Sequence, residues 1–76
     1  MVETDLITIV ARNIRRLRRA KGWSQERLAS ECDLHRTYIG AIERHERNIT
    51  LETLQRLADG LGCTAGFLIS EMGENI

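Results

Sequence analysis

The chain has 76 residues, 42% of them hydrophobic and 29% charged, which is typical of one small folded domain. Its longest largely apolar stretch, residues 6–11, is far shorter than the roughly 20 residues that cross a membrane. An acidic start over residues 1–5 and only two cysteines, Cys32 and Cys63, argue against a secretory signal and a disulfide framework. We therefore expect a reduced, cytoplasmic protein with a single domain over residues 1–76.

Positive charge is concentrated in one part of the chain, although the total charge is zero. Residues 12–47 carry ten basic and five acidic side chains, a net charge of +5. Residues 1–11 carry a net charge of −2, and residues 48–76 carry −3. This asymmetry points to a basic face, as in proteins that meet a polyanion. An evenly solvated helix surface is the alternative at this stage.

Apolar periodicity and capping residues predict an all-α fold of five short helices, with no segment that alternates like a strand. The first helix covers residues 6–20 and ends at Gly22. Ser24 caps a second helix, Gln25–Cys32, and a turn at Asp33 leads to a third helix, Arg36–Arg44.

The fourth helix is the most clearly amphipathic segment. Thr50 caps it, and Gly60 and Gly62 are predicted to end it. Its apolar face consists of Leu51, Leu54, Leu57, Ala58 and Leu61. Thr64 caps a fifth short helix that carries Phe67, Leu68, Ile69 and Met72.

The second and third predicted helices have the proportions of a helix-turn-helix. The third helix of such a motif enters the major groove of DNA with its N-terminus first. Arg36 can then bond to guanine, the Thr37 methyl group can meet a thymine methyl group, and the Tyr38 hydroxyl can reach a phosphate. Gly40 and Ala41 are small enough for the helix backbone to approach the bases closely.

Further DNA contacts are predicted around this helix. Gln25 begins the second helix, where free N–H groups and the helix dipole favour a phosphate. Arg44, Arg47 and Asn48 lie at the end of the third helix and in the loop after it. Arg15, Arg16 and Arg19 in the first helix are phosphate neighbours or plain surface residues, and the sequence leaves both alternatives open.

The motif region also resembles a known family. Trp23-Ser24-Gln25-Glu26-Arg27-Leu28-Ala29, then Leu34, Tyr38-Ile39 and Ile42-Glu43-Arg44, resembles the Cro and phage-repressor-like (XRE) helix-turn-helix family over residues 10 to about 70. Arg36-Thr37-Tyr38-Ile39, Ile42-Glu43-Arg44, Arg47-Asn48 and Thr50 are most similar to the controller proteins of restriction–modification systems. The resemblance implies a lambda-repressor-like five-helix domain.

The resemblance also implies roles for single residues. It places DNA contacts at Gln25, Arg36, Thr37 and Tyr38, and it pairs Arg18 with Glu43 in a structural ion pair. The chain departs from the family pattern at two positions. Asp33 stands where the turn often has glycine or asparagine, and His35 stands where controller proteins tend to have an aspartate, which weakens the expected cap of the third helix.

The remaining candidates have simpler explanations. Cys32, His35, His45 and Cys63 offer atoms that bind zinc, but their spacing fits no common site, so no metal or other cofactor is expected. Trp23 is expected to pack on the first helix. No catalytic set can be assembled, so we expect no enzyme. Phe67, Leu68, Ile69 and Met72 exceed what one small helix buries and are expected to form a dimer contact, with a purely internal core as the alternative.

Together these features predict a homodimeric, sequence-specific DNA-binding transcriptional regulator on a palindromic operator, of the restriction–modification controller type. Its expected partners are double-stranded DNA, a second copy and RNA polymerase, and its expected location is the cytoplasm with the nucleoid. A phage-type repressor or another small XRE regulator is the alternative within the same class. An antitoxin-like protein-binding module is the alternative from a different class.

Overall fold

The protein is described by a computed structural model, which covers residues 5–71. Five helices and no strand lie within these residues: α1 (Leu6–Ala20), α2 (Gln25–Cys32), α3 (Arg36–Glu43), α4 (Leu51–Leu61) and α5 (Ala65–Leu68). The predicted all-α, five-helix fold is confirmed, and the predicted bounds of α3 differ from the observed ones by one residue, Arg44, which caps the helix. No helix in the described part of the chain is long and apolar enough to cross a membrane.

Short polar side chains begin the helices where the sequence predicts them. The hydroxyl oxygens of Ser24, Thr50 and Thr64 each accept a hydrogen bond of 3.0 Å from the backbone N–H three residues ahead. Asp5 caps α1 in the same way, and its hydrogen bonds with the hydroxyl and backbone N–H of Thr8 lower the pKa of its carboxyl group. These caps satisfy donors that the first turn of a helix leaves unpaired.

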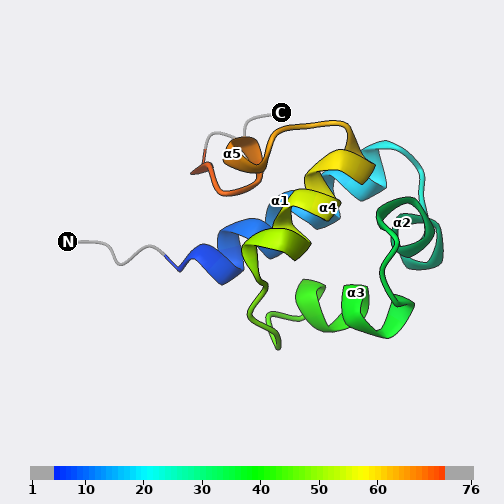
Figure 1. The fold of residues 1–76 in the computed structure, drawn as a ribbon, viewed down its shortest axis with the longest axis horizontal. Coiled ribbons are helices and arrows are strands. Elements are labelled where there is room, and N and C mark those ends of the chain that lie inside the picture. Colours follow the sequence, from blue (N-terminus) through cyan, green and yellow to red (C-terminus); the bar gives the residue numbers. More distant parts are fainter. Residues whose placement is uncertain (1–4, 72–76) are drawn as a thin grey trace.

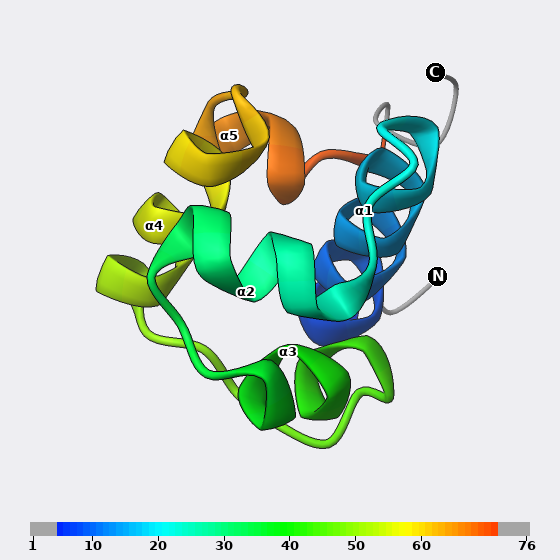
Figure 2. The same ribbon diagram turned by 90° about the vertical axis from the view of Figure 1, so that its right-hand side faces the viewer.

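The helices enclose one apolar core. Figure 1 shows α2 and α3 at one end of the molecule and α5 toward the other. In Figure 2, α1 and α4 stand on opposite sides, with α2 between them in this view and α3 below, and α5 packs against both α4 and α1. The largest fully buried apolar side chains come from all five helices: Ile14, Leu28, Ile39, Ile42, Leu57 and Leu68. Because every helix contributes to this core, packing fixes the angle at which α3 is presented.

Gly60 does not end α4, as the sequence suggests, but lies inside it. A β-carbon at Gly60 would collide with Sγ of Cys32 and stand 3.0 Å from the backbone oxygen of Glu31. The missing side chain therefore lets α4 approach the end of α2 closely. Gly62 alone ends the helix, with φ of 77° in the left-handed region that favours glycine.

Asn13 is a fully buried polar residue of α1 that the sequence analysis does not single out. Its side-chain amide donates to the backbone oxygens of Leu68 at 2.8 Å and Ser70 at 3.0 Å, and more weakly to that of Phe67 at 3.5 Å. These oxygens lie at the end of α5, where a helix leaves carbonyl groups unpaired. One amide of α1 therefore anchors the end of α5.

Candidate nucleic-acid interface

The turn between α2 and α3 is made by Asp33, as predicted. Its φ of 57° and ψ of 47° place it in the left-handed region, which aspartate tolerates better than most residues. The backbone oxygen of Asp33 also accepts a hydrogen bond of 3.2 Å from Arg56 of α4. The turn of the helix-turn-helix is thus joined to α4 by an arginine outside the motif.

His35 caps α3 itself, although it replaces the expected acid. Its Nδ1 accepts a hydrogen bond of 3.2 Å from the backbone N–H of Thr37. An imidazole nitrogen thus takes the place of the carboxylate oxygen as the capping acceptor. This acceptor requires the neutral form of the ring.

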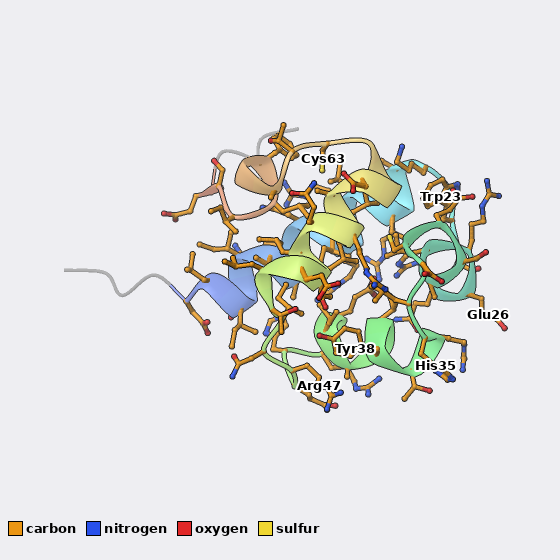
Figure 3. The ribbon with its side chains drawn as sticks, in the orientation of Figure 1. Trp23, Glu26, His35, Tyr38, Arg47 and Cys63 are labelled. Atoms are coloured by element: carbon orange, nitrogen blue, oxygen red, sulfur yellow. The ribbon has the colours of Figure 1, made fainter. Side chains whose placement is uncertain are left out.

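The exposed side of α3 forms a shallow depression, which we call the α3 depression. It is lined by His35, Thr37, Tyr38, Ala41, Arg44, Glu46 and Arg47. The structure thus brings together five of the eight residues expected to bind DNA: Thr37, Tyr38, Ala41, Arg44 and Arg47. Figure 3 shows His35, Tyr38 and Arg47 along the same edge of the molecule.

Two arginines of the α3 depression already have partners within the chain. The guanidinium of Arg47 lies 5.0 Å from the centre of the Tyr38 ring, within the range of a cation–π contact. Arg44 forms an exposed ion pair of 3.1 Å with Glu46. Exposed pairs of this kind are weak, so both guanidinium groups are available to a phosphate.

The other three expected DNA contacts lie outside the depression. Arg36 is the exposed first residue of α3, and no side-chain contact is recorded for it within residues 5–71. Gln25 is half-buried, and its Nε2 donates to Oε1 of Glu43 at 3.1 Å, so its side chain is turned toward the inside of the motif. Asn48 lies in the loop after α3 and lines a different hollow.

Glu43 is the centre of a hydrogen-bonded network that joins three helices. Its carboxylate accepts from Nε of Arg18 at 2.7 Å and Nη2 of Arg18 at 3.0 Å, and only 6% of the residue is exposed. Arg18 also donates to the backbone oxygen of Trp23 at 2.9 Å. The residues that the family resemblance pairs are therefore in contact, and they connect α1 to α3.

Arg15 has a structural contact that the two sequence alternatives, phosphate neighbour or surface residue, do not include. Its Nη2 donates to the backbone oxygen of Glu43 at 2.9 Å. This oxygen is at the C-terminus of α3, where the helix dipole favours a cation. Arg12, Arg15, Arg16 and Arg19 together line one shallow hollow on α1.

Gly40 is buried beneath two of the residues expected to bind DNA. A β-carbon there would lie 3.1 Å from Nη1 of Arg44 and 3.6 Å from Oε1 of Gln25. The absent side chain therefore leaves room for these two side chains against α3. Ala41 is half-exposed and lines the α3 depression.

The residues that were expected to form a dimer contact differ in their exposure to solvent. Leu68 is fully buried in the core of its own chain, so it has no surface left for a partner, and its assignment to a dimer contact is corrected. Phe67 is half-buried, Ile69 is 42% exposed, and Met72 lies outside the described residues.

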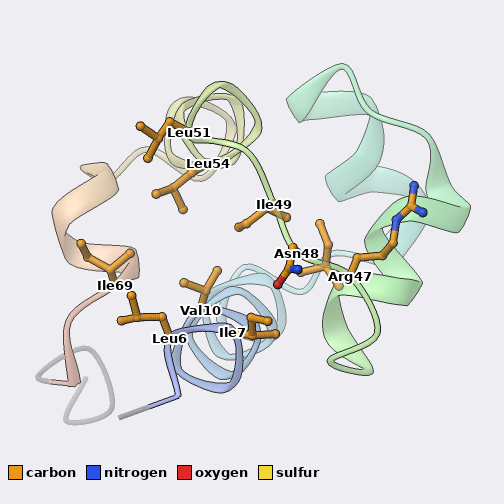
Figure 4. Close-up of a pocket in the computed structure, with 10 residues that line it drawn as sticks. Leu6, Ile7, Val10, Arg47, Asn48, Ile49, Leu51, Leu54 and Ile69 are labelled. Atoms are coloured by element: carbon orange, nitrogen blue, oxygen red, sulfur yellow. The ribbon is translucent and has the colours of Figure 1, made fainter.

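A second hollow, which we call the apolar groove, lies between α1, α4, α5 and the loop after α3 (Figure 4). It has a volume of about 230 Å³. It is lined by Leu6, Ile7, Val10, Ile42, Arg47, Asn48, Ile49, Leu51, Leu54 and Ile69. Sequence periodicity could not show it, because its walls come from four separate segments.

Cys63 and Trp23 lie away from α3 in Figure 3, and Cys32 is buried in the core at the end of α2. Burial raises the pKa of the Cys32 thiol to about 11 and also raises the pKa of Cys63, and both thiols are free. No group of side chains that could hold a metal ion occurs within residues 5–71. The Trp23 ring packs against the core. The Lys21 ammonium and the Arg27 guanidinium lie 5.1 and 4.9 Å from the centre of this ring.

A family model described as "Helix-turn-helix" matches residues 14–68. The chain is 48% identical over 63 residues to a hypothetical transcription factor of Neisseria meningitidis; the match covers 83% of this chain but only 59% of that protein. It is 46% identical over 69 residues to the control protein C.SmaI of Serratia marcescens, covering 91% of this chain and 82% of that one.

Solved structures resemble the whole fold. A hypothetical transcription factor from Neisseria has a TM-score of 0.89 at 43% identity, covering 99% of this chain and 86% of that one. The restriction–modification controller protein C.Esp1396I, solved as a tetramer with its natural 35-base-pair operator, has a TM-score of 0.81 at 37% identity. That match covers 96% of this chain and 95% of that one.

Proposed function

Because the chain belongs to the helix-turn-helix family, we propose that it is a sequence-specific DNA-binding transcriptional regulator of the restriction–modification controller type. The observation that carries this proposal is the α3 depression, which runs along the exposed side of α3 from Thr37 near its start to Arg44 and Arg47 at its C-terminal end. The resemblance to two controller proteins favours this type over a phage-type repressor and over an antitoxin-like module.

In the proposed complex, α3 enters the major groove with its N-terminus first. Arg36 bonds to the O6 and N7 atoms of guanine, and the Thr37 methyl group meets a thymine methyl group. Tyr38, Arg44 and Arg47 lie farther along the same exposed side and bind the DNA backbone. The small side chain of Ala41 lets this side of α3 approach the DNA closely.

Gln25 and Asn48 contribute from either side of α3. The Gln25 amide is held by Glu43, so its phosphate contact comes from the backbone N–H groups at the start of α2 and from the remaining amide hydrogen. Asn48 extends the contact from the loop after α3.

The proposed regulator acts as a homodimer on a roughly palindromic operator. One helix-turn-helix covers a single half-site, and two half-sites about 34 Å apart place both recognition helices on one face of the duplex. The tetramer of C.Esp1396I on its operator supports such an assembly by analogy. The proposal places the protein in the cytoplasm with the nucleoid, with RNA polymerase as a further partner and residues 1–76 as one domain.

Selection of bound duplexes from a random pool tests the proposal. We expect enrichment of a sequence with two inverted half-sites, and a selected duplex that binds at least about 1,000-fold more tightly than a scrambled one at the same salt concentration. Failure to enrich any sequence, with binding equal for all duplexes, would remove the sequence-specific function.

A further inference from the structure

His35 lines the α3 depression but has no part in the DNA contacts proposed above. It is exposed, it directly precedes Arg36, and it lies at the same edge of the molecule as Tyr38 and Arg47 (Figure 3). In the proposed complex α3 enters the major groove with its N-terminus first. A side chain at this position therefore lies among the first to reach the DNA.

The cap of α3 determines which ring nitrogen of His35 carries the proton. Nδ1 accepts a hydrogen bond of 3.2 Å from the backbone N–H of Thr37, so this nitrogen carries no proton. In the neutral ring the proton is therefore on Nε2, which is a donor. Within residues 5–71, no acceptor is recorded for this Nε2–H. The cap thus leaves a donor at the start of α3 that has no partner in the described part of the chain.

We propose that His35 is a further base-reading residue, whose Nε2–H donates to an acceptor at the edge of the base pair beside the one that Arg36 contacts. This inference rests on the proposed function, because it adds a residue to the same DNA interface. The acceptors that fit are N7 of a purine, O6 of guanine and O4 of thymine. The amino groups of adenine and cytosine are donors and do not fit.

The neutral ring favours a base edge over a phosphate. An uncharged N–H lacks the positive charge that strengthens a hydrogen bond to a phosphate. The α3 depression already supplies two guanidinium groups, those of Arg44 and Arg47, toward the C-terminal end of α3. His35 lies at the opposite end of the helix, where a neutral donor adds selectivity rather than electrostatic affinity.

The cap also orders the ring before DNA is bound. Because Nδ1 is tied to the helix backbone, rotation of the His35 side chain is restricted. A contact made by a side chain that is already ordered loses less conformational entropy than a contact made by a freely rotating one. The same hydrogen bond therefore serves both the start of α3 and the orientation of the donor.

His35→Ser removes the distant donor and keeps a cap. The backbone at His35, with φ of −78° and ψ of 142°, resembles that at Ser24, with φ of −76° and ψ of 169°, where a hydroxyl caps α2. The variant should therefore unfold at the wild-type temperature. At pH 8, where imidazole is normally neutral, it should bind the selected duplex about 10-fold more weakly than wild type.

Titration of duplexes changed at single positions locates the contact. The wild type should prefer one base pair beside the position that Arg36→Ala relaxes, and His35→Ser should accept all four base pairs there. It should keep the preference at the position read by Arg36.

His35→Asp reverses the polarity of the contact. Asp5 shows that an aspartate of this chain can cap a helix through the N–H two residues ahead, at 3.1 Å, which is the spacing between His35 and Thr37. Since a carboxylate only accepts, the preferred base at this position should become one that presents an amino group, cytosine or adenine. Ser30→Asp adds the same charge at an exposed position of α2 outside the depression and should keep the wild-type preference.

Nitrogen NMR of the ring tests the donor in the absence of DNA. At pH 8 the free wild type should carry the His35 ring proton on Nε2, and this signal should shift when the selected duplex is added. A proton on Nδ1 would remove the cap on which the inference depends and would overturn it.

The remaining outcomes separate this inference from the proposed function. Equal base preferences in wild type and His35→Ser, with or without a lower melting temperature, would overturn the inference and leave the regulator intact. Loss of affinity by one factor for selected and scrambled duplexes would indicate a phosphate contact and would also overturn it. If selection enriches no duplex, the proposed function itself fails, and the base contact fails with it.

Discussion

The Glu43 carboxylate, at the end of the recognition helix, is held by two hydrogen bonds from one guanidinium group, that of Arg18 in α1. The two bonds measure 2.7 and 3.0 Å, and the side chains of Arg18 and Glu43 are only 12% and 5% exposed. The pair thus fixes the C-terminal end of α3 to α1.

Arg18→Ala should lower the free energy of unfolding by about 3–5 kcal/mol, because it leaves the Glu43 carboxylate buried without its main partner. Denaturant unfolding measures the loss. Arg27→Ala is the control, since the Arg27–Glu31 pair is 56% and 40% exposed and should contribute below about 1 kcal/mol. If Arg18→Ala melts like wild type and binds DNA more weakly, Arg18 is a phosphate contact instead.

Arg36→Ala should weaken binding to the selected duplex by about 1–3 kcal/mol and relax the preference at one base pair, without changing the melting temperature. The reason is its exposed position at the start of α3. Titrations of the selected duplex and of duplexes changed at single positions measure this effect. Arg19→Ala, an exposed arginine at the far end of α1, should leave every base preference intact. An Arg36→Ala protein that keeps the wild-type ratio between selected and scrambled duplexes contradicts direct base recognition.

Gly60→Ala should destabilise the fold by about 1–3 kcal/mol, because the new methyl group meets the backbone of Glu31 as well as the Cys32 sulfur. Gly66→Ala is the matched control. Its nearest neighbour would be Oγ1 of Thr64 at 3.9 Å, so that change should be neutral or slightly stabilising. Thermal unfolding of the two variants compares them directly, and equal melting temperatures would show that α2 and α4 can move apart without cost.

Ionisation of the Cys32 thiol should lower the free energy of unfolding at alkaline pH. Its pKa is 9.0 in an exposed chain and about 11 in the fold, so the unfolded state loses the thiol proton first as the pH rises. Stability from this group is therefore intact below pH 9 and falls between pH 9 and 11, by about 2 kcal/mol at the upper end.

Cys32→Ala should remove this part of the pH dependence, and the difference between the unfolding free energies of wild type and variant, measured at both ends of that range, isolates it. Other groups that titrate there affect both proteins alike. If the difference between the two unfolding free energies is the same at pH 9 and at pH 11, the thiol is as solvated in the fold as in the unfolded chain.

Much of the fold follows from local sequence signals. Ser24, Thr50 and Thr64 begin helices because a hydroxyl can pair a free N–H of the next turn, and Asp33 turns the chain because it tolerates a left-handed backbone. These interactions reach over three or four residues, so a single sequence contains them in full. The exposed start of α3 at Arg36 follows from the same signals.

The structural features that the sequence did not predict depend on contacts between residues that are distant in the sequence. Gly60 looks like a helix end until Cys32 is seen against it, and Leu68 looks like surplus apolar surface until the core closes over it. Arg15 could be assigned only after the C-terminus of α3 had been placed beside it. The apolar groove belongs to this class as well, because no stretch of sequence contains more than part of its lining.

The anchoring of α5 by Asn13 has a consequence for synthesis of the chain. The amide and its acceptors are 54 to 57 residues apart in sequence, and α5 has only four residues, too few to be stable alone. Since α1 leaves the ribosome first and must wait for residues 67–70, the core closes only once those residues have been translated. Until then the apolar face of α1 lacks its final cover, so folding of this domain is a late event in its own biosynthesis.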